Sequence, residues 1–189
     1  DFTQGDTDAS TASATPIEFV VGALGQITRK LSGELTVGYA NTLSDQADLS
    51  TQGPVGSAIL RYSFSSATNI AVGYRRTIQA MVLLNSSSSD APFIQLNAAL
   101  FGRLIFSLYG EYAFRQFERS LNDPGDGKRS ANVVTGDAKA EYWFFDWLNA
   151  SIGYRMVLQN PTEQAPNSEA IFLQDFTRHQ VGLNVGFRY

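Results

Sequence analysis

Residues 180–189, Gln180-Val-Gly-Leu-Asn-Val-Gly-Phe-Arg-Tyr189, carry the pattern that decides the fold of this chain. Every second side chain in this stretch is apolar, and the positions between them are polar or glycine. Because a β-strand directs successive side chains to opposite faces, such a strand has one apolar face and one polar face. The pattern fits either a strand of a soluble sheet or a strand of a membrane barrel, and the rest of the chain must separate the two.

The composition limits the class of protein. The chain has 189 residues, the length of one domain, with 43% hydrophobic, 12% aromatic and only 17% charged residues. Cysteine is absent, which excludes disulfides, thiolate metal sites and a cysteine nucleophile. A net charge of -4 without a Lys/Arg-rich run argues against nucleic acid as a partner. No apolar run approaches the roughly 18 residues of a membrane helix, so a membrane protein with this sequence would be a closed barrel.

The same alternation recurs along the chain and predicts about nine antiparallel strands. Short turns alternate with long polar loops between these strands. A Gly-Tyr or Gly-x-Tyr motif also recurs about once per hairpin, which indicates that one hairpin unit is used repeatedly. The predicted strands are residues 17–27, 31–42, 55–64, 69–78, 93–101, 104–117, 133–144, 147–157 and 172–189, and the predicted long loops are residues 43–53, 85–90, 121–130 and 159–170.

Three features favour a membrane barrel over a soluble sandwich. The predicted strands match the roughly 9–11 residues that a tilted membrane strand needs. Long loops alternate with tight turns, as in outer-membrane barrels. Aromatic residues gather at both ends of the strands, as two interfacial girdles would require. Those at the long-loop ends are Tyr39, Tyr74, Tyr112 and Tyr154, and those at the short-turn ends are Phe64, Phe101, Tyr142, Trp143, Phe144, Trp147 and Tyr189.

The sequence therefore predicts an all-β, antiparallel up-and-down transmembrane β-barrel over residues 17–189, preceded by a polar extracellular loop or tail at residues 1–16. If the short turns are periplasmic, both the first and the ninth strand descend. Bacterial single-chain barrels have an even number of strands, so we expect that this chain is the C-terminal portion of a larger barrel. The alternatives are that residues 17–27 are not a wall strand or that one strand is unrecognised.

The last strand resembles the C-terminal strand of bacterial outer-membrane β-barrels. The assembly signal of those barrels, polar-x-Gly-x-x-apolar-x-apolar, falls on Gln180, Gly182, Val185 and Phe187, with Tyr189 as the terminal aromatic residue. Together with residues 32–39, 56–63 and 69–76, this strand resembles the C-terminal half of the putative β-barrel porin type 2 family. The resemblance implies a Gram-negative outer-membrane location, contact with outer-membrane lipid, insertion by the barrel assembly machinery, and association with exopolysaccharide export.

The charged residues of the predicted polar face are the candidates for lumen lining. In a small barrel they would pair with one another and fill the interior, whereas in a barrel of 16 or more strands they would line a channel. The candidates are Glu34, Arg61, Arg75, Glu111, Arg115, Asp137, Lys139, Glu141 and Arg155, with Arg178 and Arg188 on the same predicted face.

Neither a catalytic nor a metal site is evident in the sequence. His179 is the only histidine, its alternation directs it to lipid, and Asp175 on the same strand lies about 13 Å away at the rise of a strand. Residues 122–127 hold Asn, Asp and Gly but lack the complete calcium-loop pattern. We therefore expect no cofactor, no metal and no enzymatic activity.

The predicted function is a porin-like outer-membrane channel for polysaccharide export or small-solute transport, with further subunits or an export complex as partners. The alternative is a structural or adhesive barrel that acts through the loops at residues 43–53, 121–130 and 159–170. A barrel enzyme is disfavoured because a single histidine is available.

Overall fold

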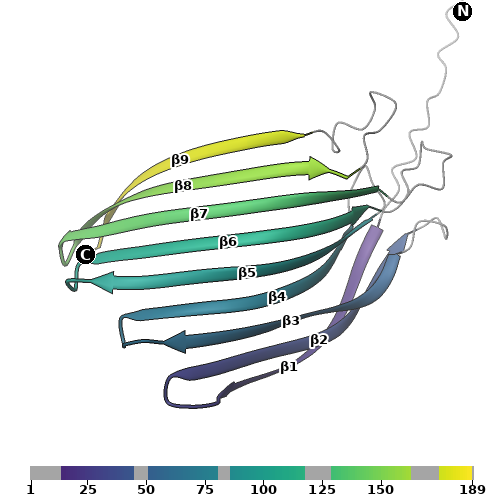
Figure 1. Cartoon of the computed structure of the whole chain (residues 1–189), viewed down its shortest axis with the longest axis horizontal. Helices are drawn as coiled ribbons and strands as arrows, with labels where there is room; N and C mark the ends of the chain where they lie inside the picture. The colour runs from purple at the N-terminus through teal and green to yellow at the C-terminus, as the bar shows by residue number, and fades with distance from the viewer. Residues whose placement is uncertain (1–13, 45–50, 81–85, 118–128, 163–174, 189) are drawn as a thin grey trace, which may run out of the picture.

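The protein folds into one nine-stranded antiparallel sheet whose strands follow one another in chain order (Figure 1). The structure is a computed structural model that describes residues 14–44, 51–80, 86–117, 129–162 and 175–188. These residues contain no helix that is long and apolar enough to cross a membrane. The strands are β1 (Ala14–Gln26), β2 (Leu31–Ser44), β3 (Thr51–Ser63), β4 (Thr68–Ala80), β5 (Ser86–Leu100), β6 (Leu104–Phe117), β7 (Arg129–Phe145), β8 (Leu148–Pro161) and β9 (Phe176–Phe187).

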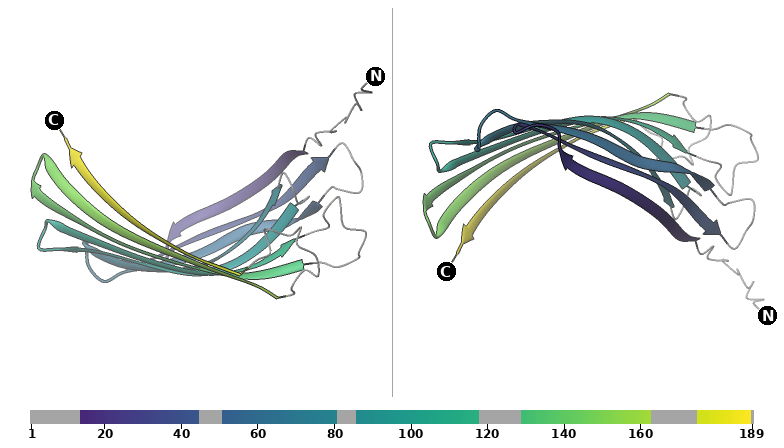
Figure 2. Two further views of the ribbon diagram at one scale, coloured as in Figure 1. Left: turned by 90° about the horizontal axis from the view of Figure 1, so that it is seen from above. Right: turned by 90° about the horizontal axis from the view of Figure 1, so that it is seen from below.

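The sheet is strongly curved and has one concave and one convex face (Figure 2). Each strand pairs with its neighbours in the chain, so β1 and β9 are the two edges and each has one paired side in the described part of the chain. Every step from β1 to β9 is antiparallel, and therefore β1 and β9 run in the same direction. The up-and-down topology that the alternation predicts is confirmed, and the nine strands do not close on themselves.

Several strands extend further than the hydrophobic alternation predicts, whereas β9 is shorter than the predicted residues 172–189. The predicted loop at residues 85–90 is wrong from Ser86 onward, because this serine run is the start of β5 and pairs with both β4 and β6. In the same way β3 begins at Thr51, β7 begins at Arg129 and β8 continues to Pro161. The ladder is made by backbone groups, so it continues where both faces are polar and the alternation has stopped. The central parts of the other three predicted loops, at residues 43–53, 121–130 and 159–170, lie outside the described residues.

The short connections follow the prediction closely, and the β5–β6 turn has the geometry of a tight hairpin. Phe101 and Gly102 both have positive φ, 53° and 69°. The backbone N–H of Arg103 donates a hydrogen bond to the carbonyl oxygen of Leu100 at 3.2 Å. Positive φ at both central residues matches the right-handed twist of the flanking strands, which explains why Gly102 stands here.

The two faces of the sheet differ in the size and polarity of their side chains. The convex face presents large apolar residues to the outside, with Val181 70% and Leu183 76% exposed. The concave face holds small side chains that curvature crowds together, and Ala71, Ala113 and Val133 are almost fully buried there. A soluble barrel would place its large apolar side chains inside. The opposite arrangement is the one expected of a wall with lipid on its outer side.

Candidate functional site on the concave face

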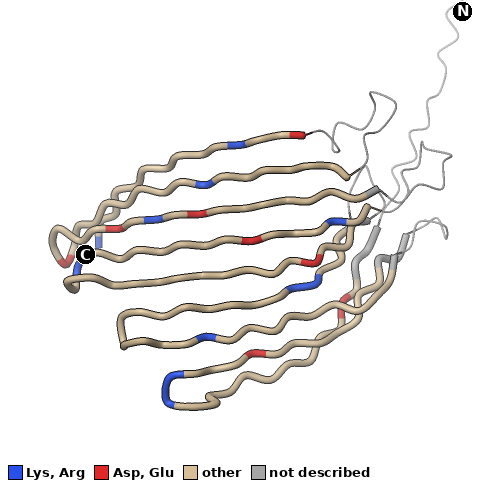
Figure 3. The backbone as a smooth tube through the Cα atoms, viewed as in Figure 1, with Lys and Arg blue, Asp and Glu red and all other residues tan. Residues whose placement is uncertain are grey.

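All nine predicted lumen-lining residues lie on the concave face. Residues that stand opposite each other in an antiparallel pair share a face, and one such row runs across the sheet through Arg61, Asp137 and Arg155. The adjacent row contains Glu34 and Glu111. The remaining four occupy same-face positions of their strands and are Arg75, Arg115, Lys139 and Glu141. Figure 3 colours the basic and acidic residues along the backbone. Their role in lining a lumen stays a prediction.

On β7 and β8 the concave charges neutralise one another. The Nε atom of Arg155 lies 2.5 Å from Oδ1 of Asp137, and Nζ of Lys139 lies 2.9 Å from Oε2 of Glu141. The side-chain amide of Asn149 also donates a hydrogen bond to Oε1 of Glu141 at 2.9 Å. Lys139 and Arg155, the cations of β7 and β8 whose side chains the structure describes, therefore each have a carboxylate partner, which is the behaviour expected of structural ion pairs.

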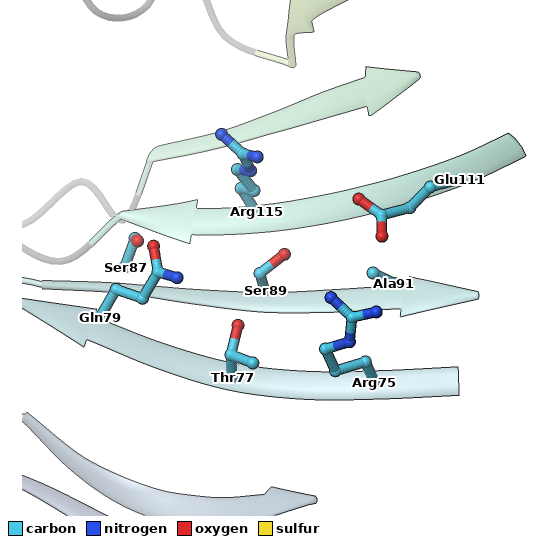
Figure 4. Close-up of a pocket in the computed structure, with 8 residues that line it drawn as sticks. All are labelled: Arg75, Thr77, Gln79, Ser87, Ser89, Ala91, Glu111 and Arg115. Atoms are coloured by element: carbon cyan, nitrogen blue, oxygen red, sulfur yellow. The ribbon is translucent and has the colours of Figure 1, made fainter. Parts of the chain in front are cut away.

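On β4 to β6 the concave charges are not neutralised in this way. Among the described residues, no carboxylate lies within 4.0 Å of the guanidinium of Arg75 or of Arg115. The nearby carboxylate of Glu111 accepts a hydrogen bond from the hydroxyl of Tyr109. The two arginines and Glu111 line a cleft of about 140 Å³ in the concave face (Figure 4).

An aromatic platform that the sequence analysis missed lies beside this cleft. The guanidinium carbon of Arg75 stands 5.3 Å from the centre of the Phe93 ring, and the centre of the Tyr109 ring lies 5.8 Å from that of Phe93. Gly73 leaves room for the ring, because a Cβ atom there would come within 2.5 Å of Phe93 Cζ. The sequence signal that could have revealed this platform is Phe93 itself, an aromatic residue two positions from Gln95 and therefore on the polar face of β5.

The convex face carries a repeated tyrosine contact near the long-connection end. Tyr112 donates a hydrogen bond to Oδ1 of Asn132 at 2.9 Å, and the hydroxyl of Tyr154 lies 2.8 Å from Nδ1 of His179. Tyr74 makes the equivalent contact with Asp90, which also forms an ion pair with Arg76 at 3.2 Å. In each case the partner lies on the next strand, one same-face position beyond the residue opposite the tyrosine. An apolar ring with a hydrogen-bonded hydroxyl at its outer end is typical of a membrane boundary.

These contacts also place His179, which lies on the convex face as its alternation predicts. Its contact is with a tyrosine rather than with a carboxylate and a nucleophile. Within the described ranges, no group of three His, Cys, Asp or Glu residues is arranged to hold a metal ion. The Asn/Asp/Gly cluster at residues 122–127 lies outside the described residues.

In β9 the predicted assembly signal divides between the two faces. Gln180 and Gly182 stand opposite Arg155 and Gly153 on the concave face, whereas Val185 and Phe187 lie on the convex face. The Phe187 ring is 6.3 Å from that of Trp147 in a stacked arrangement at the short-turn end of the sheet. Tyr189 lies outside the described residues, and recognition of this strand by an assembly machinery stays a prediction.

One member of the predicted short-turn girdle lies on the wrong face. Trp143 stands opposite Asn149, in step with Glu141, and therefore belongs to the concave face. The alternation of β7 decides this, because Tyr142 precedes Trp143 and faces the convex side opposite Ala150. A run of consecutive aromatic residues at the end of a strand cannot all face lipid.

The fold and the division of its faces define an all-β protein of the β-barrel type. Comparison with protein families gives a match over residues 3–189 to the family described as Putative beta-barrel porin 2. The chain belongs to this family, as the resemblance of its strands predicted. Comparison with curated proteins and with solved structures finds no match.

Proposed function

We propose that this chain forms part of the wall of an outer-membrane channel, with its convex face in lipid and its concave face lining a water-filled lumen. The observation that carries this proposal is the division of one curved sheet into an exposed apolar convex face and a charged concave face. Membership in a β-barrel porin family supports it. On this account the barrel wall begins with β1 at Ala14, three residues earlier than the sequence predicts, and the residues before it are extracellular.

The two sheet edges indicate how such a wall would close. Lipid offers no partner to the open backbone groups of a strand, so both β1 and β9 need further pairing in a membrane. Direct closure would pair β1 with β9 in parallel, because the two strands run the same way. A second copy rotated about the barrel axis would meet the same parallel edges. We infer that an odd number of further strands separates β9 from β1 and makes every pair antiparallel.

The concave face fits the passage of polar solutes. Its arginines, carboxylates, hydroxyls and amides would hydrate a pore and interact with small charged or hydroxylated solutes, including an exported polysaccharide. Insertion into a Gram-negative outer membrane would use the barrel assembly machinery, with β9 as its signal. A pore is favoured over an enzyme because the one histidine, His179, lies on the proposed lipid side and forms a hydrogen bond with Tyr154.

Two measurements on the full-length protein in detergent and in bilayers test this function. Cryo-electron microscopy should count more strands than the nine seen here, all antiparallel, around an open lumen. Planar-bilayer recording should find stepwise ionic conductance. A barrel closed by a β1–β9 pair, or a folded protein that conducts no ions, would contradict the proposal.

A structural or adhesive barrel is the second candidate function. The ion pairs Asp137–Arg155 and Lys139–Glu141 favour it, because paired charges are what fills the interior of a narrow barrel. This candidate expects a lumen plugged by side chains and no conductance, and its work would lie in the long connections between strands. The same strand count and bilayer recording therefore separate the two candidates.

A further inference from the structure

The concave face has a cleft whose shape follows from the size of side chains on three adjacent strands. The central strand, β5, contributes only small residues, and Ser87 and Ala91 form a floor that is 3% and 5% exposed. The flanking strands β4 and β6 contribute long side chains that rise on either side of this floor (Figure 4). The lining residues are Arg75, Thr77 and Gln79 from β4, Ser87, Ser89 and Ala91 from β5, and Glu111 and Arg115 from β6.

The cleft has one positive charge in excess, because two arginines and one carboxylate, Glu111, line it. Arg75 and Arg115 stand on opposite walls, and neither has a carboxylate within 4.0 Å among the described residues. The single carboxylate, that of Glu111, accepts a hydrogen bond from the hydroxyl of Tyr109 and forms no ion pair within 4.0 Å with either arginine. On β7 and β8, by contrast, Arg155 and Lys139 are both neutralised by carboxylates. Arg61 and Arg178 on the concave face are also without an ion pair among the described residues. The cleft differs from those positions because two arginines line the same cavity.

The side chain of Arg75 packs against an aromatic ring. Its guanidinium stands over the Phe93 ring at 5.3 Å, and this ring fits against Gly73 and is flanked by Tyr109. A guanidinium held against an aromatic face loses less freedom when it binds a ligand, and its N–H groups remain available at the edge. Hydroxyls of Thr77 and Ser89 lie in the same cleft between the two arginines and add neutral donors.

We propose that the Arg75–Arg115 cleft is an anion-binding station that takes a carboxylate or phosphate group of a passing solute. Planar guanidinium groups bind these oxyanions through two parallel hydrogen bonds, and hydroxyl groups complete the shell. The role of the station in transport rests on the proposed function, because a solute reaches the cleft through the lumen. Its place near the long connections puts it at the outer mouth of the channel.

Direct binding to the full-length protein in detergent is the first test. Isothermal titration with inorganic phosphate and, separately, with acetate should detect binding that the variant Arg75→Gln/Arg115→Gln weakens roughly tenfold or more. The matched control is Arg76→Gln, which removes the same charge from the next residue but on the convex face. Binding of phosphate alone would assign the station to phosphate groups, and binding of acetate alone would assign it to carboxylates. Binding that is equal in all three proteins would overturn the proposal.

Bilayer recording then separates this proposal from the proposed function. In a KCl gradient, the reversal potential of the variant Arg75→Gln/Arg115→Gln should move toward cation selectivity. Millimolar phosphate should also block the current through this variant less than the current through the unchanged protein. Arg76→Gln should behave like the unchanged protein. If all variants conduct with the same selectivity and the same phosphate block, the proposed channel function is supported and the anion-binding station is contradicted. Arginine-dependent phosphate binding by a protein that conducts no ions would keep the binding site and overturn the channel.

Discussion

The convex and concave faces are built by the same nine strands, yet they follow opposite rules. The convex face exposes Leu183 and Ile152, side chains that a water-soluble protein would bury. The concave face buries alanines and directs arginines and carboxylates into the space that the sheet encloses. The difference shows that the curvature of the sheet and the polarity of its faces are coupled. Small residues on the concave face permit the sheet to bend, and the charged residues lie on that same face.

The largest effect is expected from a charge placed on the lipid side. Ile152→Arg on the convex face should destabilise the folded protein in vesicles by about 2–4 kcal/mol, because arginine near the bilayer midplane loses its hydration. The neighbouring concave variant Ser151→Arg should cost much less, since on the proposed water-filled side the new guanidinium keeps its hydration, opposite the already paired Glu141. Urea unfolding in lipid vesicles, followed by tryptophan fluorescence, measures both. Equal losses in the two variants would remove the distinction between the faces.

The close fit of Phe93 against Gly73 gives the next largest effect. Gly73→Ala should cost about 1–3 kcal/mol, because the new methyl group overpacks against a ring that it would meet within 2.5 Å. Gly136→Ala is the matched control, since no atom lies within 4 Å of a Cβ atom at that position. Replacing Phe93 by Leu in the Gly73→Ala background should recover part of the loss. If Gly73→Ala is as mild as Gly136→Ala, the platform beneath Arg75 is not tightly packed.

The smallest effect concerns the ion pairs of the concave face. Asp137→Asn should cost only about 0.2–1 kcal/mol, because the side chain of Arg155 is 56% exposed and water screens the pair. A double-mutant cycle with Arg155→Gln measures the coupling from the same unfolding curves. A coupling well above this range would indicate a dry, filled interior and would favour the structural barrel over the channel.

Period-two alternation was sufficient to predict the nine strands, their order and the face of each of the nine candidate lumen-lining residues. It failed at the strand ends: the serine run from Ser86 to Ser89 has no apolar alternation of its own, yet this run pairs with both β4 and β6. It also could not separate paired charges from unpaired ones. Whether Arg155 contacts Asp137 depends on the register between β7 and β8. The contact between Phe93 and Gly73 depends on the register between β4 and β5, and the loop that joins these strands has no sequence signal for that register.

The central claim is that alternate side chains of one strand face lipid and water. The chain contains no cysteine, so single cysteines at Ser151, Ile152, Tyr154 and Arg155 can carry nitroxide labels in the full-length protein reconstituted into vesicles. Electron paramagnetic resonance should find labels at 152 and 154 more accessible to oxygen, which partitions into lipid, and labels at 151 and 155 more accessible to a water-soluble nickel chelate. Accessibility without a period of two, or with the faces exchanged, would contradict the account.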